Sequence, residues 1–64
     1  MEANLKKMKW EMKRQGITHQ MLADKIGKKR QVVGYYLKYG PKSLRVIDKI
    51  AKALGFDDAK DLII

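Results

Sequence analysis

A guanidinium and a carboxamide stand next to each other at Arg30 and Gln31, shortly after Gly27. Arginine can donate two parallel hydrogen bonds to O6 and N7 of guanine, and glutamine can pair in a similar two-point manner with adenine. We expect both residues to lie near the start of a helix over about residues 29–38. Their types and position therefore predict contacts to the edges of bases, and the other interpretation is a merely solvated helix face.

The spacing around Gly27 predicts two short helices that meet at a tight turn. Ala23 lies four residues before the glycine and Val33 six residues after it, so that a small residue stands where the helices cross and an apolar residue anchors the second one. Thr18 is a suitable N-cap for the first of the two helices, which we expect to end near Ile26. This is the pattern of a helix-turn-helix motif over about residues 18–38, whose second helix enters the DNA major groove.

The formal net charge of +8 is placed unevenly along the 64 residues. No acidic residue lies between Asp24 and Asp48, whereas four of the seven acids occur from Asp48 onward. The basic residues of the acid-free stretch are Lys25, Lys28, Lys29, Arg30, Lys38, Lys42 and Arg45. Such a field suits a polyanion, because phosphate contacts dominate affinity for nucleic acids. The alternative interpretation is that the same positive charge only keeps the protein soluble.

Apolar residues at helical spacing predict further helices and no strand. We expect a first helix over residues 3–15, closed by Gly16, and a last short helix that Asp57 or Asp58 caps and that carries Leu62 and Ile63. Between them, Ser43 is expected to cap a fourth helix that stops at Gly55 and has an inner stripe of Leu44, Ile47, Ile50, Ala51 and Leu54. The predicted fold is an all-α, compact five-helix bundle in which residues 1–64 form a single domain.

Several classes of protein do not fit this composition. With no cysteine there is no disulfide and no zinc site of the usual kind, and the single histidine, His19, has no second ligand for a metal. Neither a nucleophile with its base nor a glycine-rich phosphate loop after a strand is present, so we expect no enzymatic activity, no cofactor and no small-molecule ligand. No apolar run approaches the roughly 20 residues that span a bilayer, and no signal peptide is evident, so we expect a cytoplasmic location.

Over nearly its whole length the chain resembles the Cro/C1-type (XRE-type) helix-turn-helix family of phage and bacterial transcription regulators. The residues that carry the resemblance are Ile17-Thr18, Leu22-Ala23, Lys25-Ile26-Gly27, Val33, Tyr36, Ser43-Leu44 and Ile50-Ala51-Lys52-Ala53-Leu54-Gly55. His19 departs from the family's usual glutamine, and Lys28 from its usual apolar residue. The resemblance implies a lambda-repressor-like DNA-binding domain and a sequence-specific transcriptional regulator, in the first place a repressor, that inserts residues 29–38 into the major groove.

The candidate contacts to DNA fall into two groups. Base reading is expected from Arg30, Gln31, Gly34 and Tyr35, the last two because related regulators also touch DNA one turn into this helix. Phosphate contacts are expected at the edges of the motif, from Thr18, His19, Gln20, Lys28, Lys29, Lys38, Lys42 and Arg45. Gly34 could equally reflect tight packing against a neighbouring helix. Tyr36 fits the core better than a contact, and Tyr39 fits either role.

Double-stranded DNA is the expected partner. One recognition helix reads only a few base pairs, so we expect a palindromic operator bound by a weak or DNA-induced homodimer. The candidate dimer contacts are Phe56, Leu62, Ile63 and Ile64, although Leu62 and Ile63 could instead complete the core. Two alternatives stay open: an antitoxin or protein-bridging module on the same fold with DNA binding secondary, and RNA binding, in which Tyr35 and Tyr39 would stack on bases.

Overall fold

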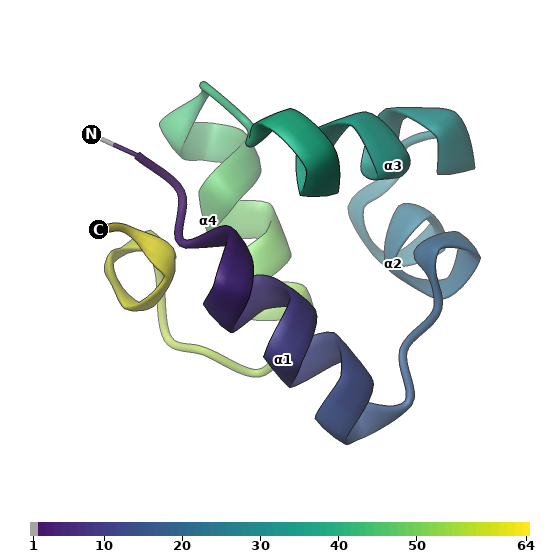
Figure 1. The fold of residues 1–64 in the computed structure, drawn as a ribbon, viewed down its shortest axis with the longest axis horizontal. Coiled ribbons are helices and arrows are strands. Elements are labelled where there is room, and N and C mark those ends of the chain that lie inside the picture. Colours follow the sequence, from purple (N-terminus) through teal and green to yellow (C-terminus); the bar gives the residue numbers. More distant parts are fainter. Residues whose placement is uncertain (1) are drawn as a thin grey trace.

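The computed structural model describes residues 2–64, which form four α-helices and one turn of 3-10 helix (Figure 1). In chain order these are α1 (Leu5–Gln15), α2 (His19–Ile26), α3 (Arg30–Tyr39), α4 (Leu44–Ala53) and η1 (Ala59–Leu62). The described residues contain no strand longer than the isolated antiparallel bridge between Ala3 and Ile63. The predicted all-α fold is therefore confirmed, and the predicted count of five helices is wrong.

The segment expected to form a fifth helix makes the single turn η1 instead. Asp58 does cap it, since its Oδ1 accepts a hydrogen bond from the Lys60 amide at 2.9 Å. The turn does not lengthen, because its last residue and the backbone beyond it pair with the start of the chain. The Asn4 amide donates to the Leu62 carbonyl at 2.7 Å, and the Ile64 amide donates to the Glu2 carbonyl at 2.8 Å. Pairing with the N-terminal segment thus holds the last residues extended rather than helical.

The other helix ends follow local chemistry. Asn4 caps α1 by accepting from the Lys7 amide at 3.1 Å, so this helix starts two residues later than predicted. Gly16 closes it in the left-handed conformation, with φ at 70°, which a residue with a Cβ rarely adopts. Ser43 takes the N-cap position of α4, but within the described chain its side chain makes no capping hydrogen bond, contrary to the prediction.

All four α-helices and η1 contribute to one core. Six large side chains in it are fully buried: Met8, Leu22, Val33, Ile47, Ile50 and Leu62. The inner stripe of α4 is as predicted from Ile47 to Leu54, but Leu44 is wrong, because 53% of this side chain is exposed. Leu44 is the first residue of α4, where a groove beside η1 leaves the side chain uncovered.

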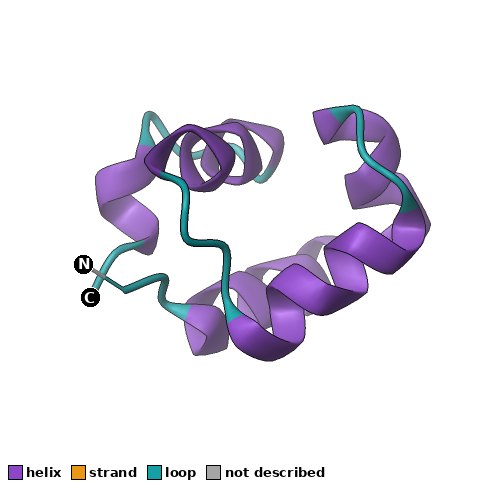
Figure 2. Ribbon diagram, turned by 90° about the horizontal axis from the view of Figure 1, so that it is seen from above, coloured by secondary structure: helices purple, strands orange, loops and turns teal. Residues whose placement is uncertain are grey.

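The arrangement of the helices places α3 at the edge of the molecule and brings the start and the end of the described chain together. In Figure 1, α3 lies along one edge of the molecule next to α2, and α1 crosses in front of α4. The start and the end of the described chain lie side by side in both ribbon views (Figures 1 and 2), as the Ala3–Ile63 bridge requires. Across residues 2–64, no helix combines the length and the apolar character that crossing a bilayer demands.

Candidate nucleic-acid interface

The corner between α2 and α3 is fixed by a short turn and two buried side chains. Gly27 has a φ of 72°, and its amide and that of Lys28 both donate to the carbonyl of Ala23, the latter at 2.9 Å. Ala23 and Val33 are both fully buried, so the small residue lets the two helices approach and the apolar residue anchors the second. The spacing argument for this turn is confirmed. Its consequence is a rigid angle between α2 and the start of α3.

The start of α3 points basic and amide groups outward. Lys29 is the N-cap residue, and Arg30 and Gln31 are the first two residues of the helix, all three of them exposed. A lysine side chain has no acceptor, and within the described chain α3 has no side-chain cap and no acid in its first turn. Its first N–H groups and the positive end of its dipole are therefore available to an external anion, whereas Asn4 and Thr18 cap α1 and α2.

The outer face of α3 continues from Gln31 to the other candidates. Tyr35 lies one turn further on and is 55% exposed. Gly34 is half-buried, yet a Cβ added there would meet no described atom within 4 Å, apart from the neighbouring turns of its own helix. The interpretation that Gly34 is required for packing against a neighbouring helix is therefore wrong. Tyr36 is half-buried against the core, as expected.

The phosphate candidates are all exposed, but some already have partners. The Thr18 hydroxyl oxygen accepts from the Met21 amide at 3.1 Å, as predicted for an N-cap, which leaves its O–H free to donate. The Gln20 amide nitrogen donates to Asp24 at 3.0 Å. Lys38 places its ammonium 5.3 Å from the centre of the Tyr39 ring. Lys28, Lys29 and Arg45 extend from the turn and from the first turn of α4.

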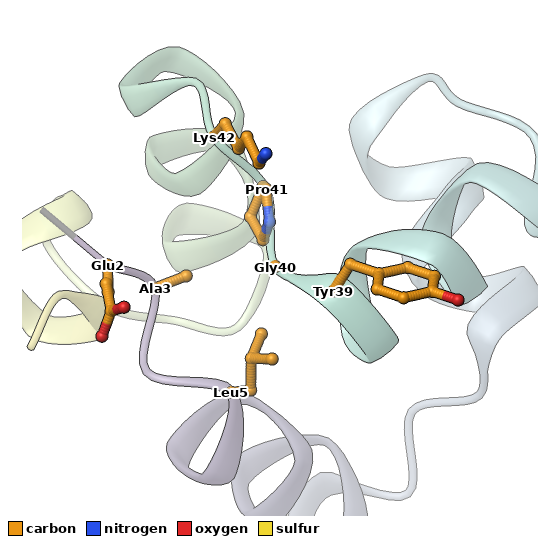
Figure 3. Close-up of a pocket in the computed structure, with 7 residues that line it drawn as sticks. All are labelled: Glu2, Ala3, Leu5, Tyr39, Gly40, Pro41 and Lys42. Atoms are coloured by element: carbon orange, nitrogen blue, oxygen red, sulfur yellow. The ribbon is translucent and has the colours of Figure 1, made fainter.

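Lys42 follows the breaker segment that ends α3. It borders a hollow of about 480 Å³ between this segment and the start of the chain, lined by Glu2, Ala3, Leu5, Tyr39, Gly40, Pro41 and Lys42 (Figure 3). Figure 3 shows the Tyr39 ring directed back along α3 rather than into the loop. Lys42 is thus an exposed basic residue that follows the end of α3, as Lys38 is in its last turn.

Ion pairs within the described chain leave the positive charge around α3 intact. The two ion pairs found within residues 2–64 are Arg14 with Glu11 and Lys52 with Asp48. Neither ion pair involves a basic residue of the acid-free stretch between Asp24 and Asp48, which includes α3. The positive charges of that stretch are therefore not cancelled by a carboxylate in contact. A surface of this kind attracts phosphate groups over the screening length of the solution.

Two basic residues of α1 were missed at the sequence level. Lys9 and Lys13 border a small hollow of about 190 Å³ together with His19, the first residue of α2, and Ile17 before it. They add positive charge where the N–H groups of α2 begin. A one-turn spacing on α1 was visible in the sequence, but only the packing of α1 against the motif brings these lysines to its edge.

The four candidate dimer residues prove to be differently placed. Leu62 is fully buried in the protomer and offers no surface to a second copy, so its selection as a contact was wrong. Phe56 and Ile63 are half-buried, and the Lys7 ammonium lies 5.2 Å from the centre of the Phe56 ring. Ile64 is 76% exposed.

Comparisons with known proteins place this geometry in a family. A family model described as helix-turn-helix, of the XRE type, matches residues 8–59. Comparisons with curated proteins and with solved structures gave no match. The match spans most of the chain, from the middle of α1 to the start of η1. The chain therefore belongs to the XRE-type helix-turn-helix family, and it is a DNA-binding helix-turn-helix regulator.

Proposed function

We propose that this regulator is a sequence-specific, Cro/C1-like repressor that inserts α3 into the major groove of an operator. The observation that supports this most directly is the exposed start of α3, where Arg30 and Gln31 extend from the corner at Gly27 and make no ion pair within residues 2–64. In docked helix-turn-helix proteins, this end of the second helix is the part that reaches base edges. Arg30 and Gln31 read bases, and Gly34 and Tyr35 meet the groove one turn later.

The basic residues around the motif hold the phosphates on either side. Lys28 and Lys29 lie at the turn, Lys38 and Lys42 follow at the end of α3, and Arg45 lies in the first turn of α4. Thr18, His19 and Gln20 open α2, whose dipole end favours an anion. These contacts position the protein without reading sequence.

The operator is a palindrome, bound by a homodimer that forms weakly or on the DNA. A groove of about 570 Å³ between the start of α4 and η1 supports a revised contact surface, which includes the exposed Leu44 and half-buried Ile63. Charges of both signs line this groove, namely Arg45, Asp48, Asp58 and Lys60. A two-fold interface needs such a self-complementary patch, because both protomers use the same surface and every contact between two different residues occurs twice.

Selection of bound sequences from a random duplex library tests the proposal. We expect a palindrome with two short half-sites whose centres lie about one DNA turn apart. If the selection enriches no sequence and all duplexes bind with equal affinity, sequence-specific reading is contradicted. A single-stranded RNA competitor of the same length should displace the protein less well than unlabelled operator.

The dimer is tested separately by sedimentation of protein–operator complexes. Leu44→Asn should reduce the cooperative occupation of two half-sites while leaving the affinity for one isolated half-site unchanged. Met21→Asn, at another exposed apolar residue, is the matched control. Undiminished cooperativity in the Leu44 variant would exclude this groove as the contact.

A further inference from the structure

Two exposed tyrosine rings are paired on the outer face of α3. Tyr35 and Tyr39 are 55% and 60% exposed, and their ring centres lie 4.8 Å apart with the planes tilted by 44°. This separation is within the range favoured by aromatic pairs. They stand one turn apart, as side chains at i and i+4 must to touch on a helix. The core anchors of α3, Val33 and Leu37, lie on the opposite face, so the pair is not needed to fold the helix against its neighbours.

The Tyr39 ring is held on two sides. Tyr35 contacts it from the preceding turn, and the Lys38 ammonium lies 5.3 Å from its centre. Its direction back along α3, seen in Figure 3, brings it toward Tyr35. Tyr39 in turn lies against the Tyr35 ring, and this contact limits the orientations open to that ring.

The helix surface next to Tyr35 is open at Gly34. Gly34 has no side chain, and the space where its Cβ would be is open. A groove wall can therefore approach the backbone at Gly34 while it meets the ring of Tyr35 next to it. Gln31 lies one turn before Tyr35 on the same face, so the row along this face runs from a polar group to an apolar ring.

From this arrangement we propose that Tyr35 reads the C5-methyl group of a thymine in the operator, and that Tyr39 is the positioning residue that holds the Tyr35 ring in place. In the major groove, thymine differs from cytosine by its methyl group as well as by its hydrogen-bonding atoms, and apolar side-chain surface is what recognises that methyl. A neutral aromatic ring beside an open glycine supplies such a surface. The inference rests on the proposed major-groove docking of α3, and it adds the base type that the middle of α3 selects.

Replacement of single thymines by deoxyuridine tests this, because deoxyuridine lacks only the methyl group. Each thymine of the selected operator is replaced in turn. With the unaltered protein we expect one position in each half-site at which affinity falls roughly three- to fivefold, as for the loss of one buried methyl group. The Tyr35→Ala variant should bind thymine and deoxyuridine equally at that position.

Conservative variants separate contact from positioning. Tyr35→Phe keeps the ring and should keep the methyl preference, and Tyr39→Phe should keep it as well. Tyr39→Ala should reduce the preference while leaving affinity for the deoxyuridine operator unchanged. All four variants are at exposed positions, and circular dichroism should show unchanged helix content.

The possible failures are distinct. If no duplex is bound at all, the proposed function itself fails. If the operator is bound but no thymine responds to deoxyuridine, or if Tyr35→Ala retains the response, the reading of a methyl group is overturned and operator binding stands. If Tyr39→Ala behaves like the unaltered protein, the positioning role of Tyr39 is overturned.

Discussion

The Gln15 side chain joins the end of α1 to the end of α4, because its Nε2 donates to the Leu54 carbonyl oxygen at 2.7 Å. The same nitrogen donates to Oε1 of Glu11 at 2.8 Å. Glu11 is a buried acid that also accepts from the Arg14 guanidinium. A charged network thus sits at the end of α1, a few residues before the motif begins, and none of its members is a proposed DNA contact. It lets stability be altered without changing the proposed DNA contacts.

Stability should fall in acid through Glu11. Hydrogen bonds from Arg14 and Gln15 hold the pKa of the Glu11 carboxyl below its ordinary value of 4.5. The unfolded chain therefore binds a proton more readily than the folded one, so the stabilisation is complete well above pH 4.5 and is lost as the pH falls below it. Glu11→Gln should flatten the dependence of the free energy of unfolding on pH in this range, as measured with urea. Asp57→Asn, at an exposed acid, is the control, and an equal flattening there would contradict the assignment.

Gly34→Ala should separate folding from binding. Since the added methyl group meets open space, the variant should gain about 1 kcal/mol of stability from the better helix propensity of alanine. Its affinity for the operator should fall, because the proposed docking of α3 brings the wall of the major groove close to Gly34. Gly16→Ala is the matched control, because at a φ of 70° the same change should destabilise the protein. A loss of stability in the Gly34 variant on thermal unfolding would contradict the open environment.

Removal of either polar side chain at the start of α3 should change specificity. Arg30→Ala or Gln31→Ala should relax the preference at one base pair per half-site, at a cost of about 1–3 kcal/mol for the preferred base. The helical circular-dichroism signal should not change, because both residues are exposed at the helix start. Repeating the library selection with each variant measures the effect. A selected sequence identical to that of the unaltered protein would exclude the residue from base reading.

Lys42→Ala should weaken binding to all duplexes to a similar extent. If the lysine neutralises one phosphate, the slope of log affinity against log salt should become shallower by about one. Lys52→Ala is the control, because the Lys52 ammonium is already 3.0 Å from the Asp48 carboxylate. Gel-shift titrations at several salt concentrations measure both slopes. A change in base preference instead would show that Lys42 had been misassigned.

The parts of the fold that local chemistry decides could be predicted from the sequence. The turn at Gly27 and the cap at Thr18 depend on a few neighbouring residues, and both are as expected. Pairing between distant segments could not be predicted in this way. The last residues bond to the first ones, which replaced the expected fifth helix by η1 and buried Leu62. Leu44 has the right spacing for the core, but whether a neighbour covers it depends on where η1 ends.

The same division applies to the candidate site. Exposure of Arg30 and Gln31 followed from helix periodicity, because Val33 and Leu37 fix the buried face of α3. The open space at Gly34 did not, since a glycine in mid-helix fits both packing and close approach. Lys9 and Lys13 joined the edge of the motif only through the tertiary packing of α1.

The bridge between Ala3 and Ile63 has a practical consequence for any assay of this protein. Because the described chain starts and ends at one corner, a purification tag or fused protein attached beyond either end would compete for the same volume. That corner adjoins both the hollow near Lys42 and the groove that Ile63 lines. Fusions at either end would therefore crowd the same two surfaces, and untagged material is the appropriate sample for self-association measurements.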